Sequence, residues 1–111
     1  MPKYIFIYLG GETPASPEEA KRHFVDYENW LRSLGSAVVS PAIPFKDTHT
    51  VQTDGKTEPG TTTAMSGMSI IQMPTMDKAL EAARSCPFLD IGGTLEVSEM
   101  VEVAPASKKP N

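Results

Sequence analysis

One side of a predicted helix carries three side chains that could serve a reaction or bind a ligand. His23, Tyr27 and Trp30 lie along that side, at the three- and four-residue spacing of a helix. Histidine gains and loses a proton near pH 7, so His23 is the first candidate for a general base. The alternative is a structural role, in which the imidazole packs beside Tyr27 at the rim of a subunit contact.

Aromatic and methionine side chains elsewhere predict a place for a small molecule. Tyr8 lies in a tyrosine-rich first strand, and it could line an aromatic pocket together with Tyr27 and Trp30. Met68, one of three methionines within residues 65–73, adds the adaptable surface that methionine gives to pockets. Core packing, or packing against a second copy, is the other interpretation of these side chains. The predicted pocket residues are Tyr8, Tyr27, Trp30 and Met68.

The remaining reactive side chains favour structural roles. Cys86 lies at the end of a predicted helix, where the helix dipole raises the pKa of a thiol, so we expect a core residue. His49 could supply half of a metal site with His23, but a solvated strand histidine is the simpler interpretation. Gly10-Gly11 separates a strand from a helix without the glycine pattern or the lysine of phosphate loops. We therefore expect neither a metal nor a cofactor.

Composition limits the classes of partner. The 111 residues include 14 acidic and 10 basic side chains without a run rich in Lys or Arg, so we expect no nucleic-acid partner. The longest apolar run, residues 4–9, is too short to cross a bilayer, and the start shows no signal-peptide pattern. A single cysteine excludes an internal disulfide. We expect a cytoplasmic domain without membrane contact.

The strongest local signals define a helix over residues 17–34. Ser16 is a good N-cap, Pro17 suits the first helical position, and Glu19 completes a capping box. Gly35 supplies the C-terminal stop. Apolar residues at three- and four-residue spacing predict one buried stripe, formed by Ala20, Phe24, Tyr27, Leu31 and Leu34.

Alternation and turn residues predict the strands and a second helix. We expect strands over residues 3–9, 37–43, 48–53, 67–73 and 94–103, and a helix that Thr75 caps and Pro87 stops. Asp54-Gly55 predicts a two-residue type I′ hairpin turn after the third strand. Residues 57–64, rich in Thr, Gly and Pro, predict a loop or an irregular return, and residues 104–111 predict a flexible tail.

The order of these elements, with the middle hairpin set aside, is β-α-β-β-α-β. It predicts a ferredoxin-like α+β domain over residues 1–103, with an antiparallel sheet, two helices on one face and an extra hairpin. Both faces of the first strand are apolar, since Tyr and Phe alternate with Ile and Leu over residues 4–9. The helices cover one face only, so the other face needs a cover. A second copy is the economical cover, and we predict a homodimer.

Several segments resemble the YCII-related domain family. They are Ser66-Gly67-Met68-Ser69-Ile70-Ile71, Met76-Asp77-Lys78-Ala79-Leu80, Cys86-Pro87 and Gly92-Gly93-Thr94-Leu95-Glu96-Val97. The tyrosine-rich first strand, the Gly-Gly turn and the Pro-Glu-Glu helix start agree with the same family. The resemblance covers about residues 3–103. It implies a dimeric α+β barrel, in which two ferredoxin-like units pack sheet to sheet.

The resemblance also implies candidate catalytic residues. Some members of the family carry a histidine on the first helix and an aspartate in the loop after the first strand. His23 stands about where that histidine would stand, and Glu12 is the carboxylate available in the loop. Another branch carries an Asp-Gly-Pro-Phe motif, of which Asp54-Gly55 keeps the first two residues. The candidate catalytic residues are therefore His23, Glu12 and Asp54.

Two functions remain open at this point. The first is a cofactor-free enzyme that acts by acid–base chemistry on a small aromatic or carbonyl-bearing metabolite, with His23 as the base and Glu12 or Asp54 as its partner. The second is a module without catalysis that binds a small molecule or recruits a protein through an exposed sheet edge. A histidine that faces a cavity within hydrogen-bond reach of a carboxylate favours the enzyme. An apolar cavity without such a pair favours the binding module.

Overall fold

The structure contains the predicted strands and helices in the predicted order, together with a further short strand and two 3-10 helices. The computed structural model describes residues 1–102. Its elements are β1 (Lys3–Gly10), α1 (Pro17–Leu34), η1 (Gly35–Ala37), β2 (Val38–Pro44), β3 (His49–Val51), β4 (Thr57–Pro59), β5 (Met65–Gln72), α2 (Met76–Arg84), η2 (Pro87–Ile91) and β6 (Gly93–Glu99), where η marks a short 3-10 helix. Within these residues no helix is long and apolar enough to cross a membrane.

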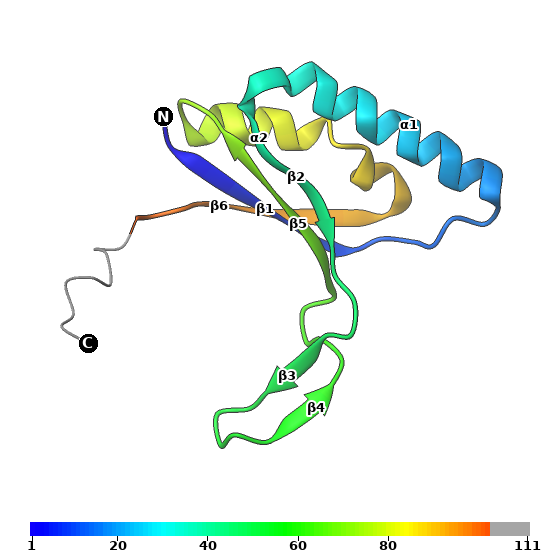
Figure 1. Cartoon of the computed structure of the whole chain (residues 1–111), viewed down its shortest axis with the longest axis vertical. Helices are drawn as coiled ribbons and strands as arrows, with labels where there is room; N and C mark the ends of the chain where they lie inside the picture. The colour runs from blue at the N-terminus through cyan, green and yellow to red at the C-terminus, as the bar shows by residue number, and fades with distance from the viewer. Residues whose placement is uncertain (103–111) are drawn as a thin grey trace.

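Four strands form one antiparallel sheet in the order β2-β5-β1-β6, and both helices lie on one face of it (Figure 1). This arrangement confirms the predicted ferredoxin-like α+β fold. Residues that pair across antiparallel strands share a face of the sheet. The residues on the helix-covered face of the two central strands are Tyr4, Phe6 and Tyr8 of β1 and Gly67, Ser69 and Ile71 of β5. All six are buried, so this face holds the core.

Helix α1 has the predicted bounds, but its buried side is rotated from the predicted stripe. Trp30 is 5 % exposed, whereas Phe24 is 62 % exposed, so the inward position predicted for Phe24 is wrong. The Trp30 ring lies 6.2 Å from that of Phe6, and its Nε1 donates to the Ala82 carbonyl at 3.0 Å. A buried indole N–H needs an acceptor, and the acceptor on α2 sets the rotation of α1.

Residues 49–59 form a separate hairpin, β3–β4, which projects away from the helices at one end of the sheet (Figure 1). The predicted loop over residues 57–64 is therefore wrong for residues 57–59, which pair with residues 49–51. The predicted type I′ turn is also wrong. The Gln52 N–H donates to the Lys56 carbonyl at 2.7 Å, and between these residues only Gly55 has a positive φ, +90°. A type I′ turn needs two such residues, and a three-residue loop needs one.

The segment after α2 also differs from the prediction. The 3-10 helix η2 lies between α2 and the last strand, where only a stop was expected. Strand β6 ends at Glu99, earlier than predicted, although the Met100 N–H still donates to the Lys3 carbonyl at 2.8 Å. Residue 103 and the predicted tail, residues 104–111, lie outside the described residues.

The face of the sheet opposite the helices is also apolar. Ile5 of β1 pairs with Ile70 of β5, and Ile7 pairs with Met68. These four side chains are half-buried and share the face that neither helix covers (Figure 1). On the β6 side, Glu96 pairs with Ile7 and borders this apolar area. The second apolar face expected for the first strand therefore extends across the two central strands.

Candidate functional site

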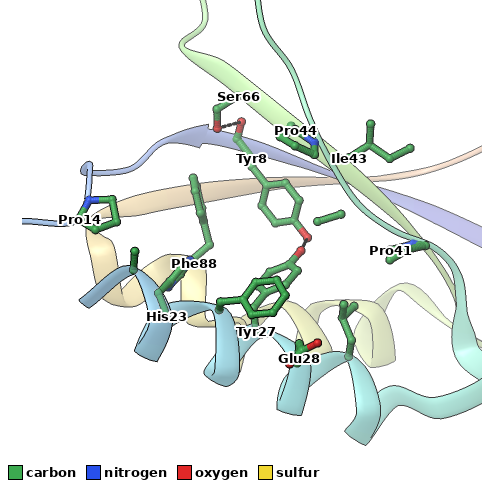
Figure 2. Close-up of a pocket in the computed structure, with 15 residues that line it drawn as sticks. Tyr8, Pro14, His23, Tyr27, Glu28, Pro41, Ile43, Pro44, Ser66 and Phe88 are labelled. Carbon is green, nitrogen blue, oxygen red and sulfur yellow. Dashed lines mark hydrogen bonds between the residues drawn. The ribbon is translucent and has the colours of Figure 1, made fainter. Parts of the chain in front are cut away.

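A cleft of about 570 Å³ opens between α1 and β2 (Figure 2). This volume lies within the range of small-molecule sites, roughly 300–1,000 Å³. Most of the lining side chains are apolar, and they come from α1, β2, the end of β1, the β1–α1 loop, β5 and η2. The lining residues are Tyr8, Pro14, Ala20, His23, Phe24, Tyr27, Glu28, Leu31, Pro41, Ala42, Ile43, Pro44, Ser66, Gly67 and Phe88.

Two tyrosines meet at the floor of this cleft. The hydroxyl groups of Tyr8 and Tyr27 are hydrogen-bonded to each other (Figure 2). The Tyr8 hydroxyl is also hydrogen-bonded to Oγ of Ser69 at 2.7 Å. Ser69 is 0 % exposed and does not line the cleft. A chain of three hydroxyls therefore connects the core to the cleft.

Burial keeps both phenols neutral. It is the main cause that raises the pKa of Tyr8, against the lowering effect of its hydrogen bonds with Ser69 and Tyr27. Burial also raises the pKa of Tyr27. Because each phenol keeps its proton at neutral pH, the pair can donate hydrogen bonds but cannot act as a base.

Phe88 closes one end of the cleft. Its ring lies edge-on to that of Tyr8, with centroids 5.1 Å apart. Two glycines make room for this ring. A Cβ on Gly11 would lie 2.8 Å from Cζ of Phe88, and a Cβ on Gly93 would also collide with the ring. Larger residues at positions 11 and 93 therefore conflict with this wall of the cleft.

The opposite wall is β2, which lies at the edge of the sheet. Its pairing with β5 shifts between Ser40 and Ile43, at the position of Pro41. Proline has no N–H for a sheet ladder, and the predicted edge position is confirmed. Gly67 of β5 lets this strand approach closely, since a Cβ there would lie 2.9 Å from the Ile43 carbonyl oxygen.

His23 lines the cleft from α1 and is half-buried. Its ring lies 6.3 Å from the ring of Tyr27. The ion pair found within residues 1–102 is Lys78–Glu81 on α2. No carboxylate of these residues therefore lies at ion-pair distance from His23. The structure thus brings His23 to the two tyrosines and leaves its imidazole without a carboxylate partner among these residues.

The other predicted site residues lie elsewhere. Glu12 is exposed in the β1–α1 loop, where its N–H donates to the Ile91 carbonyl at 2.8 Å. Asp54 lies at the hairpin turn and accepts from the Lys56 N–H at 2.9 Å. Trp30 is buried in the core, and Met68 lies on the uncovered face of the sheet. None of these four side chains lines the cleft.

Cys86 and His49 occupy the structural positions expected for them. Cys86 is 2 % exposed, and burial raises the pKa of its thiol to about 11. His49 lies on the exposed hairpin, where its Nδ1 donates to the Asp47 carbonyl at 3.0 Å. Over residues 1–102 no group of three His, Cys, Asp or Glu side chains is arranged to hold a metal ion.

Sequence reasoning missed three contributors to the site, namely Ser69, Glu28 and Phe88. A signal existed for Ser69, since it alternates with Gly67 and Ile71 on one face of an apolar strand, where a polar side chain needs a buried partner. Glu28 shares the helix with His23 and lies in the cleft. Phe88 carries no local signal, because its neighbours in the cleft come from the other end of the chain.

No protein-family model and no curated protein sequence matches the chain. A solved structure is similar to it: 5-chloro-2-hydroxyhydroquinone dehydrochlorinase from Burkholderia phenoliruptrix, in complex with 2,5-dihydroxybenzoquinone. The similarity covers 91 % of this chain and 95 % of that one, with a TM-score of 0.57 and 13 % sequence identity. The two proteins share a fold. At this identity the similarity extends to the fold alone.

Proposed function

We propose that the cleft between α1 and β2 binds a small planar metabolite bearing ring or carbonyl oxygens, and that the chain acts on it by acid–base chemistry. The observation that carries this proposal is the meeting of His23 with the hydroxyl pair of Tyr8 and Tyr27 in one apolar cleft. The imidazole takes a proton from the bound molecule. The neutral phenol pair donates a hydrogen bond to the oxygen on which negative charge develops. This chemistry uses only side chains and needs no cofactor.

The walls of the cleft support a flat ligand. Aromatic rings at its mouth and end, those of Phe24 and Phe88, offer flat apolar contact, and β2 adds prolines. The structural neighbour is a dehydrochlorinase whose complex holds 2,5-dihydroxybenzoquinone, a planar ring with oxygens around it. A molecule of that class is therefore our first probe.

A binding module without catalysis is the second candidate, and one observation favours it. His23 lacks a carboxylate at ion-pair distance among residues 1–102, and catalytic histidines are commonly oriented by such a group. In this case the cleft holds its ligand through the apolar walls and the phenols, and His23 contributes contact area only.

We also propose that the chain is a YCII-related protein that works as a homodimer. The uncovered apolar area formed by Ile5, Ile7, Met68 and Ile70 supports this proposal. A second copy stacked sheet to sheet would remove that area from water and leave Glu96 near the border. The recruitment of a different protein at the exposed sheet edge is the alternative.

Proton transfer to and from a bound probe tests the enzyme proposal. 2,5-Dihydroxybenzoquinone has ring C–H groups whose exchange with deuterium from D2O can be followed by proton NMR, and its binding can be measured by calorimetry. We expect the wild-type chain to bind the probe and accelerate exchange, and His23→Asn to bind it without acceleration. His49→Asn is the matched control, since this second histidine lies on the hairpin. Binding with equal exchange in both variants would favour the binding module, and failure to bind would refute the proposal.

A further inference from the structure

Three hydroxyl groups in a row link the interior of the protein to the floor of the cleft. Oγ of Ser69 lies 2.7 Å from the Tyr8 hydroxyl, which is in turn hydrogen-bonded to the Tyr27 hydroxyl. Ser69 is at the buried end of this chain, with 0 % exposure. Tyr27, a residue of α1, is at the other end and lines the cleft. Each hydroxyl has one proton to donate, so the chain has a direction.

The buried end decides this direction. Among residues 1–102, the Tyr8 hydroxyl is the hydrogen-bond partner of the Ser69 side chain, and no buried side-chain polar atom is left without a partner. If Tyr8 donated to Ser69, the Ser69 proton would point into the core without an acceptor, which is costly. Ser69 therefore donates to Tyr8, and Tyr8 donates its own proton to Tyr27.

The hydroxyl proton of Tyr27 then has no acceptor within the chain of hydroxyls and is available to a ligand in the cleft. The Tyr27 oxygen already accepts from Tyr8, and no other side chain or carbonyl among the described residues accepts from Tyr27. Burial raises the pKa of Tyr27, so this proton stays in place at neutral pH. The cleft thus presents a hydrogen-bond donor whose direction is fixed from the core.

We propose that the cleft selects ligands that present a hydrogen-bond acceptor to Tyr27, such as a carbonyl, quinone or phenolate oxygen. Tyr27 is the specificity-determining donor. Ser69 is a positioning residue that acts through Tyr8. This inference rests on the proposed function, because it assumes a small planar molecule in the cleft.

Three neutral probes of nearly equal shape test it. 1-Indanone can only accept a hydrogen bond, indole can only donate one, and indene does neither. Binding is followed by NMR through the ring signals of the two histidines, because His23 lines the cleft while His49 lies on the hairpin and serves as the reference. We expect 1-indanone to bind roughly tenfold more tightly than indene, as one added hydrogen bond allows. Tyr27→Phe should abolish this preference, so that 1-indanone and indene bind this variant with similar affinities.

Two serine variants test whether Ser69 acts by setting the direction of the hydrogen bonds or only by filling space in the core. Ser69→Ala removes the buried donor, so Tyr8 and Tyr27 can reverse, and the preference for 1-indanone should shrink by several-fold. Ser85→Ala is the matched control, because the Ser85 hydroxyl donates to the Ala82 backbone carbonyl and lies outside both the cleft and the hydroxyl chain. Thermal unfolding checks that each variant folds. If Ser69→Ala does not fold, the loss of preference in Tyr27→Phe alone tests the inference.

The outcomes are distinct. Probes that shift the His23 signals without any preference for 1-indanone, or with a preference that Tyr27→Phe leaves unchanged, overturn the inference and leave the cleft as a binding site. Failure of all three probes to shift the His23 signals overturns both the inference and the proposed function.

Discussion

The ring of Phe88 occupies the space that a side chain on Gly93 would take, and this contact shapes the end of the cleft. Gly93 does not have a positive φ, so its backbone would accept alanine without strain. The three atoms nearest to an added Cβ all belong to the Phe88 ring, which is therefore the main obstacle to Gly93→Ala. We expect this variant to displace the ring from Tyr8 and to lower the free energy of unfolding by about 1–3 kcal/mol, the usual cost of overpacking.

A double-mutant cycle checks this assignment by urea denaturation. Phe88→Ala removes the ring, so Gly93→Ala should cost much less in that background than in the wild type. Equal costs in the two backgrounds would show that Phe88 is not the obstacle. Gly93→Ala and Phe88→Ala should also weaken the binding of 2,5-dihydroxybenzoquinone, because the Phe88 ring is part of the cleft wall.

The burial of Cys86 predicts a loss of stability at alkaline pH. Its thiol pKa is raised from 9.0 to about 11, so between these values the unfolded thiol has lost its proton while the folded thiol keeps it. Unfolding then releases a proton, and the free energy of unfolding falls as the pH rises through this window. Below this pH window the contribution of the thiol to the free energy of unfolding does not change with pH.

Comparison with Cys86→Ala separates the contribution of this thiol from those of all other groups in the chain. The variant is expected to be less stable at neutral pH because of the lost core volume, but to show a shallower decline above pH 9. Parallel declines for the two proteins would mean that the folded thiol ionises normally. Slow reaction of the folded wild type with a thiol reagent provides an independent check.

Local signals predicted the elements of the fold because each signal acts between neighbours in sequence. Ser16 and Gly35 bound α1 at the predicted residues, and Thr75 caps α2 by accepting from the Lys78 N–H. The prediction of the hairpin turn was wrong, although it also rested on residues that are neighbours in sequence. Asp54-Gly55 is compatible with two loop lengths, and the pairing of Gln52 with Lys56 chose the longer one.

The cleft could be predicted only in part, since it depends on contacts between distant segments. Periodicity placed His23 and Tyr27 on one side of α1, and alternation placed Tyr8 on the same face of β1 as Tyr4 and Phe6, without deciding which face the helices cover. The contact of Tyr8 with Ser69 requires the register between β1 and β5, which the pattern of either strand alone does not determine. The inward turn of Trp30 depends likewise on a carbonyl of α2.

The uncovered face of the sheet predicts that one charge there will dissociate a dimer. Met68→Glu places a carboxylate among apolar side chains that would be buried between two copies, at a cost of several kcal/mol. We expect sedimentation velocity to show a dimer for the wild type and a monomer for this variant. Val25→Glu is the matched control, because Val25 is 51 % exposed on α1 and lies outside the cleft. A wild-type chain that stays monomeric as its concentration rises would contradict the dimer.

The position of Glu28 predicts which carboxylate supports His23 in proton transfer. Glu28 lines the cleft with His23, whereas Glu12 lies in an exposed loop and Asp54 at the hairpin turn. We expect Glu28→Gln to slow deuterium exchange of the bound quinone about tenfold, because the cleft then loses the negative charge that stabilises a protonated imidazole. Glu12→Gln and Asp54→Asn should leave the exchange rate unchanged.

A loss of exchange confined to Asp54→Asn would instead indicate that the hairpin of one copy reaches the cleft of another. In that case, mixing Asp54→Asn chains with His23→Asn chains would restore exchange activity in part of the dimers.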